Sequence, residues 1–224
     1  MRASILDATL GVHVAAGVLA LLAGALALGT AKGGRRHRRA GRAYVASMAV
    51  VVVTAIPLAL ADGNYFLFTV AVFSGYLVLN GYRVLSRKRP VPGEAAPLDW
   101  AAHLSMVGVG VAMVGLGGRS LLGGDGPGVV LVVFGGIGLV LAGREIRAVY
   151  RPPESPREWF YRHLAFMGGG YIATVTAAVT VNLGMLPPLV RWVGPTAVGT
   201  PAIVLAVLWY RREFGDGSGR TFGG

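Results

Sequence analysis

Seven long apolar stretches, joined by short polar connections, constrain the fold of this chain more than any other feature. They cover about residues 5–28, 43–60, 65–85, 98–116, 128–142, 159–183 and 196–210. A helix that crosses a bilayer needs about 20 apolar residues, and it satisfies its backbone hydrogen bonds internally. The pattern predicts an all-α bundle of seven transmembrane helices, one domain over residues 1–213, followed by a disordered tail at 214–224. The stretches 128–142 and 196–210 are short, so the sequence also allows tilted or re-entrant elements there.

The composition agrees with a membrane protein and excludes several kinds of site. Of the 224 residues, 54% are hydrophobic and only 14% are charged, whereas about a quarter of the residues in a soluble domain are charged. The chain has no cysteine, which excludes disulfides, thiolate metal ligands and cysteine nucleophiles. The sequence also lacks a P-loop, a nucleophile elbow and a nucleotide fingerprint in the strand–turn–helix context that such a fingerprint requires.

The run AKGGRRHRRAGRAY, residues 31–44, places a dense basic segment between the first two apolar stretches. Together with the connections after the third and fifth stretches and the C-terminal end, it collects every lysine and arginine on one side except Arg2, Arg119 and Arg191. Such a bias marks the cytoplasmic side. We therefore expect a multi-pass protein of a bacterial or archaeal inner (plasma) membrane, with the N-terminus outside and the C-terminus inside. Because charge this dense resists translocation, the first stretch is expected to be a retained helix and not a cleaved signal peptide.

The same charges predict the partners of the basic run. They attract the anionic lipid head groups of the cytoplasmic leaflet, so the bilayer is the expected partner. A nucleic-acid site is not expected, because the run is flanked on both sides by membrane-spanning stretches.

Ionisable side chains inside a membrane are costly and are the first candidates for function. His13, His103 and His163 lie in predicted helices, and His37 lies at the inner mouth of the second. With a rise of about 1.5 Å per residue, His103 and His163 reach similar depths in the cytoplasmic half. There they could face each other with His37 above them, whereas His13 stands apart. Small residues beneath these histidines would leave room for a flat ring system such as haem.

The leading functional hypothesis is a small redox or electron-transfer protein that binds one cofactor. His103 and His163 are the candidate ligands of a single haem b or metal ion near the cytoplasmic side. Further cofactor-binding candidates are His37 and His13. Two basic residues of the second helix, Arg38 and Arg42, are expected to neutralise the haem propionates.

Other readings of the same residues stay open. A zinc site of His37, His103 and His163 near Asp99 would suit a seven-helix membrane hydrolase, but the last stretch lacks the histidines expected there. The chain is alternatively a proton-coupled small-solute transporter or channel, or a non-catalytic partner subunit. The histidines would otherwise only hydrogen-bond neighbouring helices, and small residues would only let those helices pack closely. Asp99 and Glu145, near helix ends, are expected to be solvated or to compensate helix dipoles.

Several motifs are similar to those of a known family. The matching residues are His13, Lys32-Gly33, His37-Arg38, Gly41-Arg42-Ala43-Tyr44, Asp99, His103, His163-Leu164, Met167, Gly169-Gly170-Tyr171-Ile172-Ala173, Thr176-Ala177 and Val181-Asn182. Over about residues 10–210 the chain resembles a family of predicted bacterial integral membrane proteins classified only as a domain of unknown function. The resemblance implies seven helices and singles out the same histidines, but it implies no activity.

Overall fold

The computed structural model of the protein describes residues 2–124 and 128–215, and in these residues it contains helices and no strand. The helices are α1 (Arg2–Leu28), α2 (Arg35–Ala61), α3 (Tyr65–Arg83), α4 (Pro97–Leu122), α5 (Gly128–Tyr150), α6 (Glu158–Asn182) and α7 (Pro188–Glu213). A short 3₁₀ turn, η1 (Val84–Ser86), continues α3. Each of the seven is long and apolar enough to cross a bilayer. The prediction of an all-α, seven-helix membrane protein is confirmed.

The two stretches that looked short belong to full-length helices. α5 has 23 residues and α7 has 26, so both are continuous and long enough to span. The apolar stretch 128–142 is shorter than α5, because the last two turns of the helix carry arginines. The apolar stretch 196–210 misses the beginning of α7, because Pro195 lies inside the helix and interrupts the pattern. Pro188 occupies the first turn of α7, where a proline leaves no hydrogen bond unmade.

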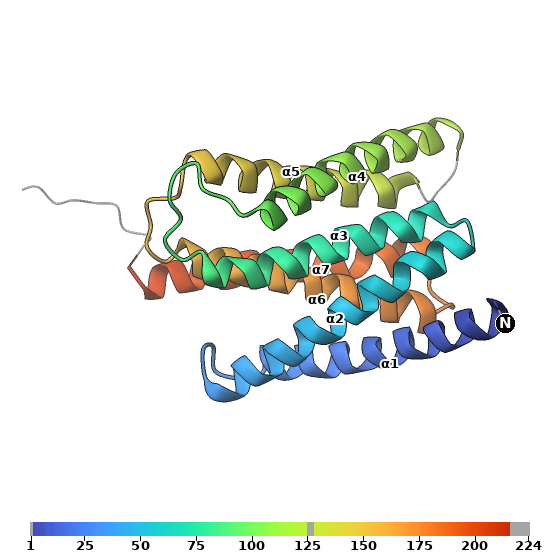
Figure 1. Cartoon of the computed structure of the whole chain (residues 1–224), viewed down its shortest axis with the longest axis horizontal. Helices are drawn as coiled ribbons and strands as arrows, with labels where there is room; N and C mark the ends of the chain where they lie inside the picture. The colour runs from blue at the N-terminus through green and yellow to red at the C-terminus, as the bar shows by residue number, and fades with distance from the viewer. Residues whose placement is uncertain (1, 125–127, 216–224) are drawn as a thin grey trace, which may run out of the picture.

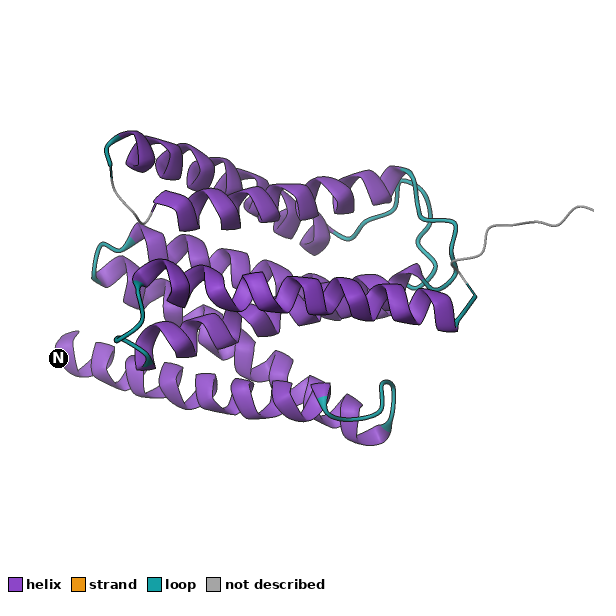
Figure 2. Ribbon diagram, turned by 180° about the vertical axis from the view of Figure 1, so that it is seen from behind, coloured by secondary structure: helices purple, strands orange, loops and turns teal. Residues whose placement is uncertain are grey.

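The helices run up and down the bundle, and their connections gather at its two ends (Figures 1 and 2). The end that carries the connections 29–34, 87–96 and 151–157 and the end of α7 is here called the basic end. α3 is central: it packs against α2, α4, α5 and α6. The α1–α2 and α4–α5 hairpins lie on opposite sides of α3 (Figure 1), and α7 lies against α6.

Several pairs of helices in the bundle stay apart, and three of these pairs bear on the placement of the candidate residues. Over their described residues, α4 and α6 have no direct backbone contact, and the same holds for α5 and α6 and for α2 and α6. α3 therefore separates the side chains of α4 from those of α6. Any contact between α5 and α6 must be made by side chains alone.

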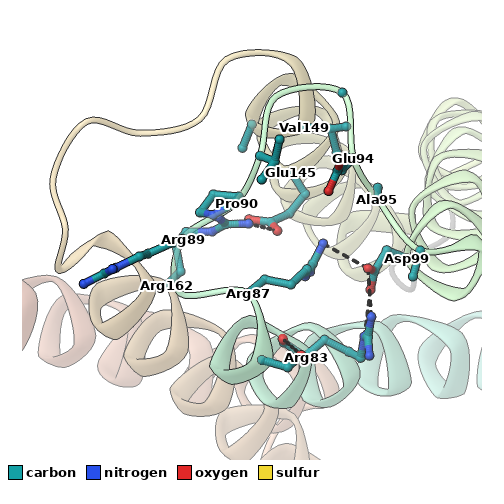
Figure 3. Close-up of a pocket in the computed structure, with 15 residues that line it drawn as sticks. Arg83, Arg87, Arg89, Pro90, Glu94, Ala95, Asp99, Glu145, Val149 and Arg162 are labelled. Carbon is teal, nitrogen blue, oxygen red and sulfur yellow. Dashed lines mark hydrogen bonds and ion pairs between the residues drawn. The ribbon is translucent and has the colours of Figure 1, made fainter.

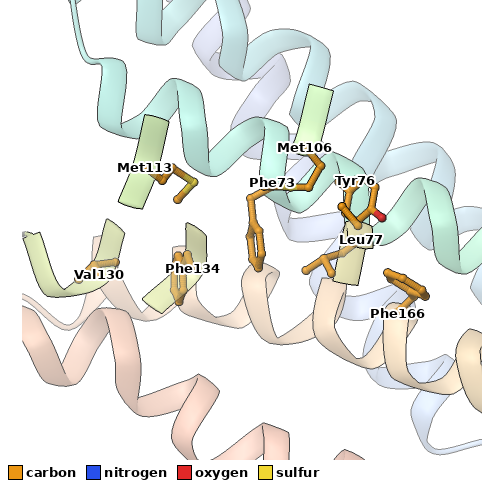
Figure 4. Packing of buried hydrophobic residues seen from close by; sticks show 9 residues of the cluster. Phe73, Tyr76, Leu77, Met106, Met113, Val130, Phe134 and Phe166 are labelled. Carbon is orange, nitrogen blue, oxygen red and sulfur yellow. The ribbon is translucent and has the colours of Figure 1, made fainter. Parts of the chain in front are cut away.

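Close packing at glycines joins α4 to α5, as is usual between membrane helices. A Cβ atom added at Gly117 would lie 2.7 Å from the carbonyl oxygen of Gly128. The hairpin in turn packs on α3 through a buried cluster in which the rings of Phe73 and Phe134 stack with centroids 5.4 Å apart (Figure 4). Met106 and Met113 are fully buried in this cluster. This packing holds α3, α4 and α5 together, and the same three helices carry charged residues at the basic end.

The structure changes the description of the basic run and of the tail. Residues 35–42 form the first two turns of α2, and only residues 29–34 make the turn. Residues 216–224 of the predicted tail and 125–127 of the α4–α5 connection lie outside the described residues. Phe214, however, is ordered: its ring packs against Phe160 with centroids 5.7 Å apart.

Candidate functional site: a charged pocket at the basic end

A cavity of about 530 Å³ opens at the basic end, between the end of α3, the connection 87–96, the start of α4, the last turns of α5 and the start of α6. Seven charged residues lie around this cavity, and charge within a membrane protein is costly. The charged residues that line it are Arg83, Arg87, Arg89, Glu94, Asp99, Glu145 and Arg162 (Figure 3).

Asp99 anchors one side of the cavity. It lies in the first turn of α4, which Pro97 begins, and its side chain is only 2% exposed. Arg83 donates from Nε to Oδ1 at 2.9 Å and from Nη2 to Oδ2 at 3.0 Å. Arg87 approaches the same carboxylate with Nη1 at 3.2 Å from Oδ2. Asp99 is therefore a buried carboxylate held by two guanidinium groups and is not solvated; its place in the first turn of α4 agrees with the other expectation, compensation of the helix dipole.

Glu145 and Arg162 form the second ion pair and connect α5 to α6. Arg162 donates from Nε to Oε1 of Glu145 at 2.9 Å, and its Nη2 contacts Oε2. The Glu145 side chain is 5% exposed. This pair bridges two helices that lack direct backbone contact over their described residues. The expectation of a solvated Glu145 is likewise wrong, because α6 brings an arginine against it.

A second cavity, of about 400 Å³, lies between α5, α6 and α7. It shares Glu145, Ala148 and Arg162 with the first cavity, so the ion pair forms part of the wall of both. Apolar residues of α6 and α7, such as Phe166 and Ile203, line much of the rest.

Arg87 follows η1 and runs between the two ion pairs (Figure 3). Burial lowers the pKa of Arg87, and the nearby carboxylates of Asp99 and Glu145 oppose that shift. An arginine stays charged in proteins under such conditions. Its Nε and Nη2 atoms are buried, and no described residue accepts a hydrogen bond from either. The two buried carboxylates, Asp99 and Glu145, thus face three partly buried guanidinium groups, which leaves an excess of one positive charge.

His103 lies one helical turn deeper than Asp99 on the same face of α4 and is fully buried. Its Nδ1 is 3.2 Å from the hydroxyl of Tyr76 on α3. The Tyr76 ring has Phe166 of α6 as a second neighbour, at 6.0 Å between centroids. Nε2 of His103 is buried and has no hydrogen-bond partner among the described residues. Of the four histidines, it is the one without a backbone carbonyl as a partner.

The structure brings His37 and His163 together, and it does not bring His103 and His163 together. The His37 and His163 rings are 6.4 Å apart between centroids and nearly perpendicular. His163 donates from Nδ1 to the carbonyl oxygen of Gly81 at 2.7 Å, and His37 donates from Nδ1 to that of Ala27 at 3.0 Å. His103 lies across α3 from this pair, because α3 separates α4 from α6. The rise per residue gives the depth of each histidine in the membrane, but it does not show that another helix lies between two of them.

The other candidates are spread over the α1–α2 hairpin. His13 places Nδ1 2.9 Å from Oγ1 of Thr54 and 3.1 Å from the carbonyl oxygen of Val51, both on α2. Arg38 donates to the carbonyl oxygen of Gly33, and Arg42 is exposed on α2. Within residues 2–124 and 128–215, no three histidine, aspartate or glutamate side chains are close enough together to hold a metal ion.

The sequence contains a signal for the pocket that is independent of the four histidines. Arg83 and Arg87 are four residues apart at the end of one apolar stretch, and Asp99 and His103 are four residues apart at the start of the next. Residues at this spacing share a helix face. Consecutive helices joined by a short connection are commonly neighbours, so the two faces meet.

Comparisons with protein-family models, curated proteins and solved structures find no match to this chain. The family resemblance therefore stays a prediction.

Proposed function

We propose that this protein is a membrane transporter whose substrate, a small charged solute, binds in the pocket at the basic end. The observation that carries the proposal is the cavity of about 530 Å³ lined by seven charged side chains, of which Asp99 and Glu145 are buried. Its volume is within the range of about 300–1,000 Å³ typical of small-molecule sites. Charged residues at membrane helix ends normally face water, whereas Asp99 and Glu145 are buried here. Maintaining such groups costs stability, and a solute site gives them a function.

The proposed orientation has the basic end in the cytoplasm of the cell and the N-terminus outside, in a plasma (bacterial inner) membrane. The support is the charge distribution. Three arginines lie at the opposite end: Arg2 begins α1, Arg119 is in the last turn of α4 and Arg191 is in the first turn of α7. The remaining basic clusters belong to the basic end. The pocket then opens toward the cytoplasm, where anionic lipid head groups surround it.

The proposal is tested by solute binding to the purified protein in lipid nanodiscs. A panel of small cations, anions and neutral solutes is screened by thermal unfolding, and hits are confirmed by calorimetry and by flux into proteoliposomes. Ala148 lines the cavity, so Ala148→Phe is expected to abolish binding by filling it. Ala101→Phe, on the exposed side of α4, is the matched control and should bind normally. Binding that Ala148→Phe leaves unchanged would place the solute elsewhere.

A second candidate function, haem binding, is favoured by the His37–His163 pair. His37 and His163 would hold the iron of such a haem, because imidazole is a common haem ligand and the centroids of the two rings are 6.4 Å apart. Both Nδ1 atoms donate to backbone carbonyls, which leaves the Nε2 lone pairs free, as in many ligand histidines. Arg38 and Arg42, which lie with His37 in the first two turns of α2, are the candidates for contact with the haem propionates.

Oxidised and dithionite-reduced absorption spectra test the haem candidate after expression with added haem. A Soret band that shifts on reduction, and that is lost in both His37→Gln and His163→Gln, is expected. His13→Gln removes a histidine that also bonds a carbonyl but lies outside the pair, so it should keep the spectrum. A colourless protein, or a spectrum that survives both changes in the pair, would exclude this assignment.

A further inference from the structure

We propose that the solute bound in the pocket carries a carboxylate group, and that Arg87 holds this group through Nε and Nη2. The inference rests on the proposed solute-binding function and names the class of substrate: a small monocarboxylic acid in its anionic form.

The geometry of the three partly buried arginines supports this assignment. In Arg83 the atoms that hold a carboxylate are Nε and Nη2, which bind the two oxygens of Asp99. In Arg162 they are again Nε and Nη2, which bind the two oxygens of Glu145. These two nitrogens form one edge of the guanidinium plane and match the spacing of two carboxylate oxygens. The same edge of Arg87 has no partner among the described residues, and both of its nitrogens are buried.

An empty edge of this kind is costly. A buried donor without an acceptor loses its hydrogen bonds to water and gains nothing in return, and the cost is larger when the group is charged. Arg87 uses its remaining terminal nitrogen, Nη1, for Asp99, so that carboxylate cannot also fill the free edge. The residue lines the cavity, which is where an acceptor from outside the chain would arrive.

Charge selects the kind of acceptor. Arg83, Arg87 and Arg162 face only Asp99 and Glu145 within the buried part of the site. The two exposed charged residues of the lining, Arg89 and Glu94, have opposite charges and add no net charge. One negative charge would therefore neutralise the site, whereas a cation would raise its excess charge. A neutral amide offers one acceptor oxygen in place of two, so it cannot satisfy both Nε and Nη2 in the manner of a carboxylate.

The wall of the cavity determines how the acid would enter. Ser86, Arg89 and Glu94 are exposed lining residues at the turn and in the connection 87–96. Since Nε and Nη2 of Arg87 are covered in this structure, neighbouring side chains must shift for a carboxylate to reach them. Two ion pairs join the helices around the cavity: Arg83–Asp99 joins α3 to α4, and Arg162–Glu145 joins α6 to α5.

The test compares acids with their amides. Protein in nanodiscs is titrated with acetate, propionate and benzoate, with acetamide, propionamide and benzamide, and with inorganic phosphate. We expect at least one monocarboxylate to bind and to raise the melting temperature, and its amide to bind at least roughly tenfold more weakly because one hydrogen bond and the ion pair are lost. Equal binding of acid and amide, or binding of phosphate without any carboxylate, would overturn the inference.

Variants at two arginines test whether the Arg87 side chain is the group that binds the carboxylate. Arg87→Lys keeps the charge but lacks the planar pair of donors, so it should weaken acid binding by roughly tenfold or more. Arg212→Lys changes an exposed arginine in the last turn of α7, outside the residues that line either cavity, and should leave the affinity within about a factor of three. Circular dichroism and gel filtration verify that both variants fold. Unchanged affinity in Arg87→Lys contradicts the assignment.

The outcomes also separate this inference from the proposed function. If a cation or a neutral solute binds, and Ala148→Phe abolishes that binding, the pocket is a solute site but the carboxylate assignment is wrong. If no solute of any charge class binds, both proposals fail.

Discussion

Arg162 on α6 holds the carboxylate of Glu145 on α5 through both Nε and Nη2, across two helices that have no direct backbone contact over their described residues. The pair therefore does two things: it closes the gap between α5 and α6, and it forms part of the wall of both cavities. Its stability contribution and its role in the pocket can be separated by substitution.

Glu145→Gln should destabilise the protein by about 3–5 kcal/mol, because it leaves a buried guanidinium without its counter-charge. Glu158→Gln is the matched control: Glu158 pairs with Arg211 in a partly exposed bridge, so its loss should cost less than about 1 kcal/mol. Denaturant unfolding in mild detergent measures both. Similar losses for the two variants would show that the Glu145–Arg162 pair is not buried in solution.

Tyr76→Phe should cost about 1–3 kcal/mol in the same assay, because it removes the hydrogen-bond partner of His103 and leaves both ring nitrogens unpaired in a buried site. Tyr44→Phe removes an equally buried hydroxyl. Its partner Thr174, however, keeps a hydrogen bond to the carbonyl oxygen of Gly170, so the cost should be smaller. The order of the two losses is the result to check; the reverse order would mean that His103 finds another partner.

Gly117→Ala should destabilise the α4–α5 hairpin by about 1–3 kcal/mol through overpacking. The new Cβ atom would lie 2.7 Å from the carbonyl oxygen of Gly128 and 2.8 Å from Cβ of Leu131. Gly115→Ala, two residues earlier, meets nothing within 4 Å. It should be neutral or stabilising by up to about 1 kcal/mol, since alanine favours the helix. Thermal unfolding of the two variants is the measurement, and equal effects would argue against close contact at Gly117.

The proposed orientation is tested by labelling introduced cysteines on intact cells with a membrane-impermeant maleimide. The chain has no cysteine of its own, so background labelling is absent. Asp62→Cys, in the α2–α3 turn, should be labelled, whereas Ala31→Cys, in the α1–α2 turn, should react only after the membrane is permeabilised. The opposite pattern would place the basic end outside the cell and would require the pocket to open there.

The candidate site was predictable from the sequence only in part. Depth along each helix follows from the rise per residue, so the four histidines could be ranked by height. Which residues face each other depends on the neighbours of each helix and on its rotation. For this reason the expected approach of His103 to His163 is not found, whereas His37 and His163 approach to 6.4 Å. Asp99 and Glu145 look like ordinary helix-end residues until their arginine partners on other helices are placed.

The sequence by itself determined the number of helices, their approximate places and the gathering of basic residues at one end. These properties are local, because each spanning segment must satisfy its own backbone and bury its own apolar length in lipid. Only the tertiary structure decided that α3 separates α4 from α6, that two carboxylates are buried, and that one edge of Arg87 is left without a partner. Lipid is as apolar as the helices, so hydrophobicity does not select helix neighbours. The fit of small residues such as Gly117 and Gly128 and the pairing of charges between distant segments do.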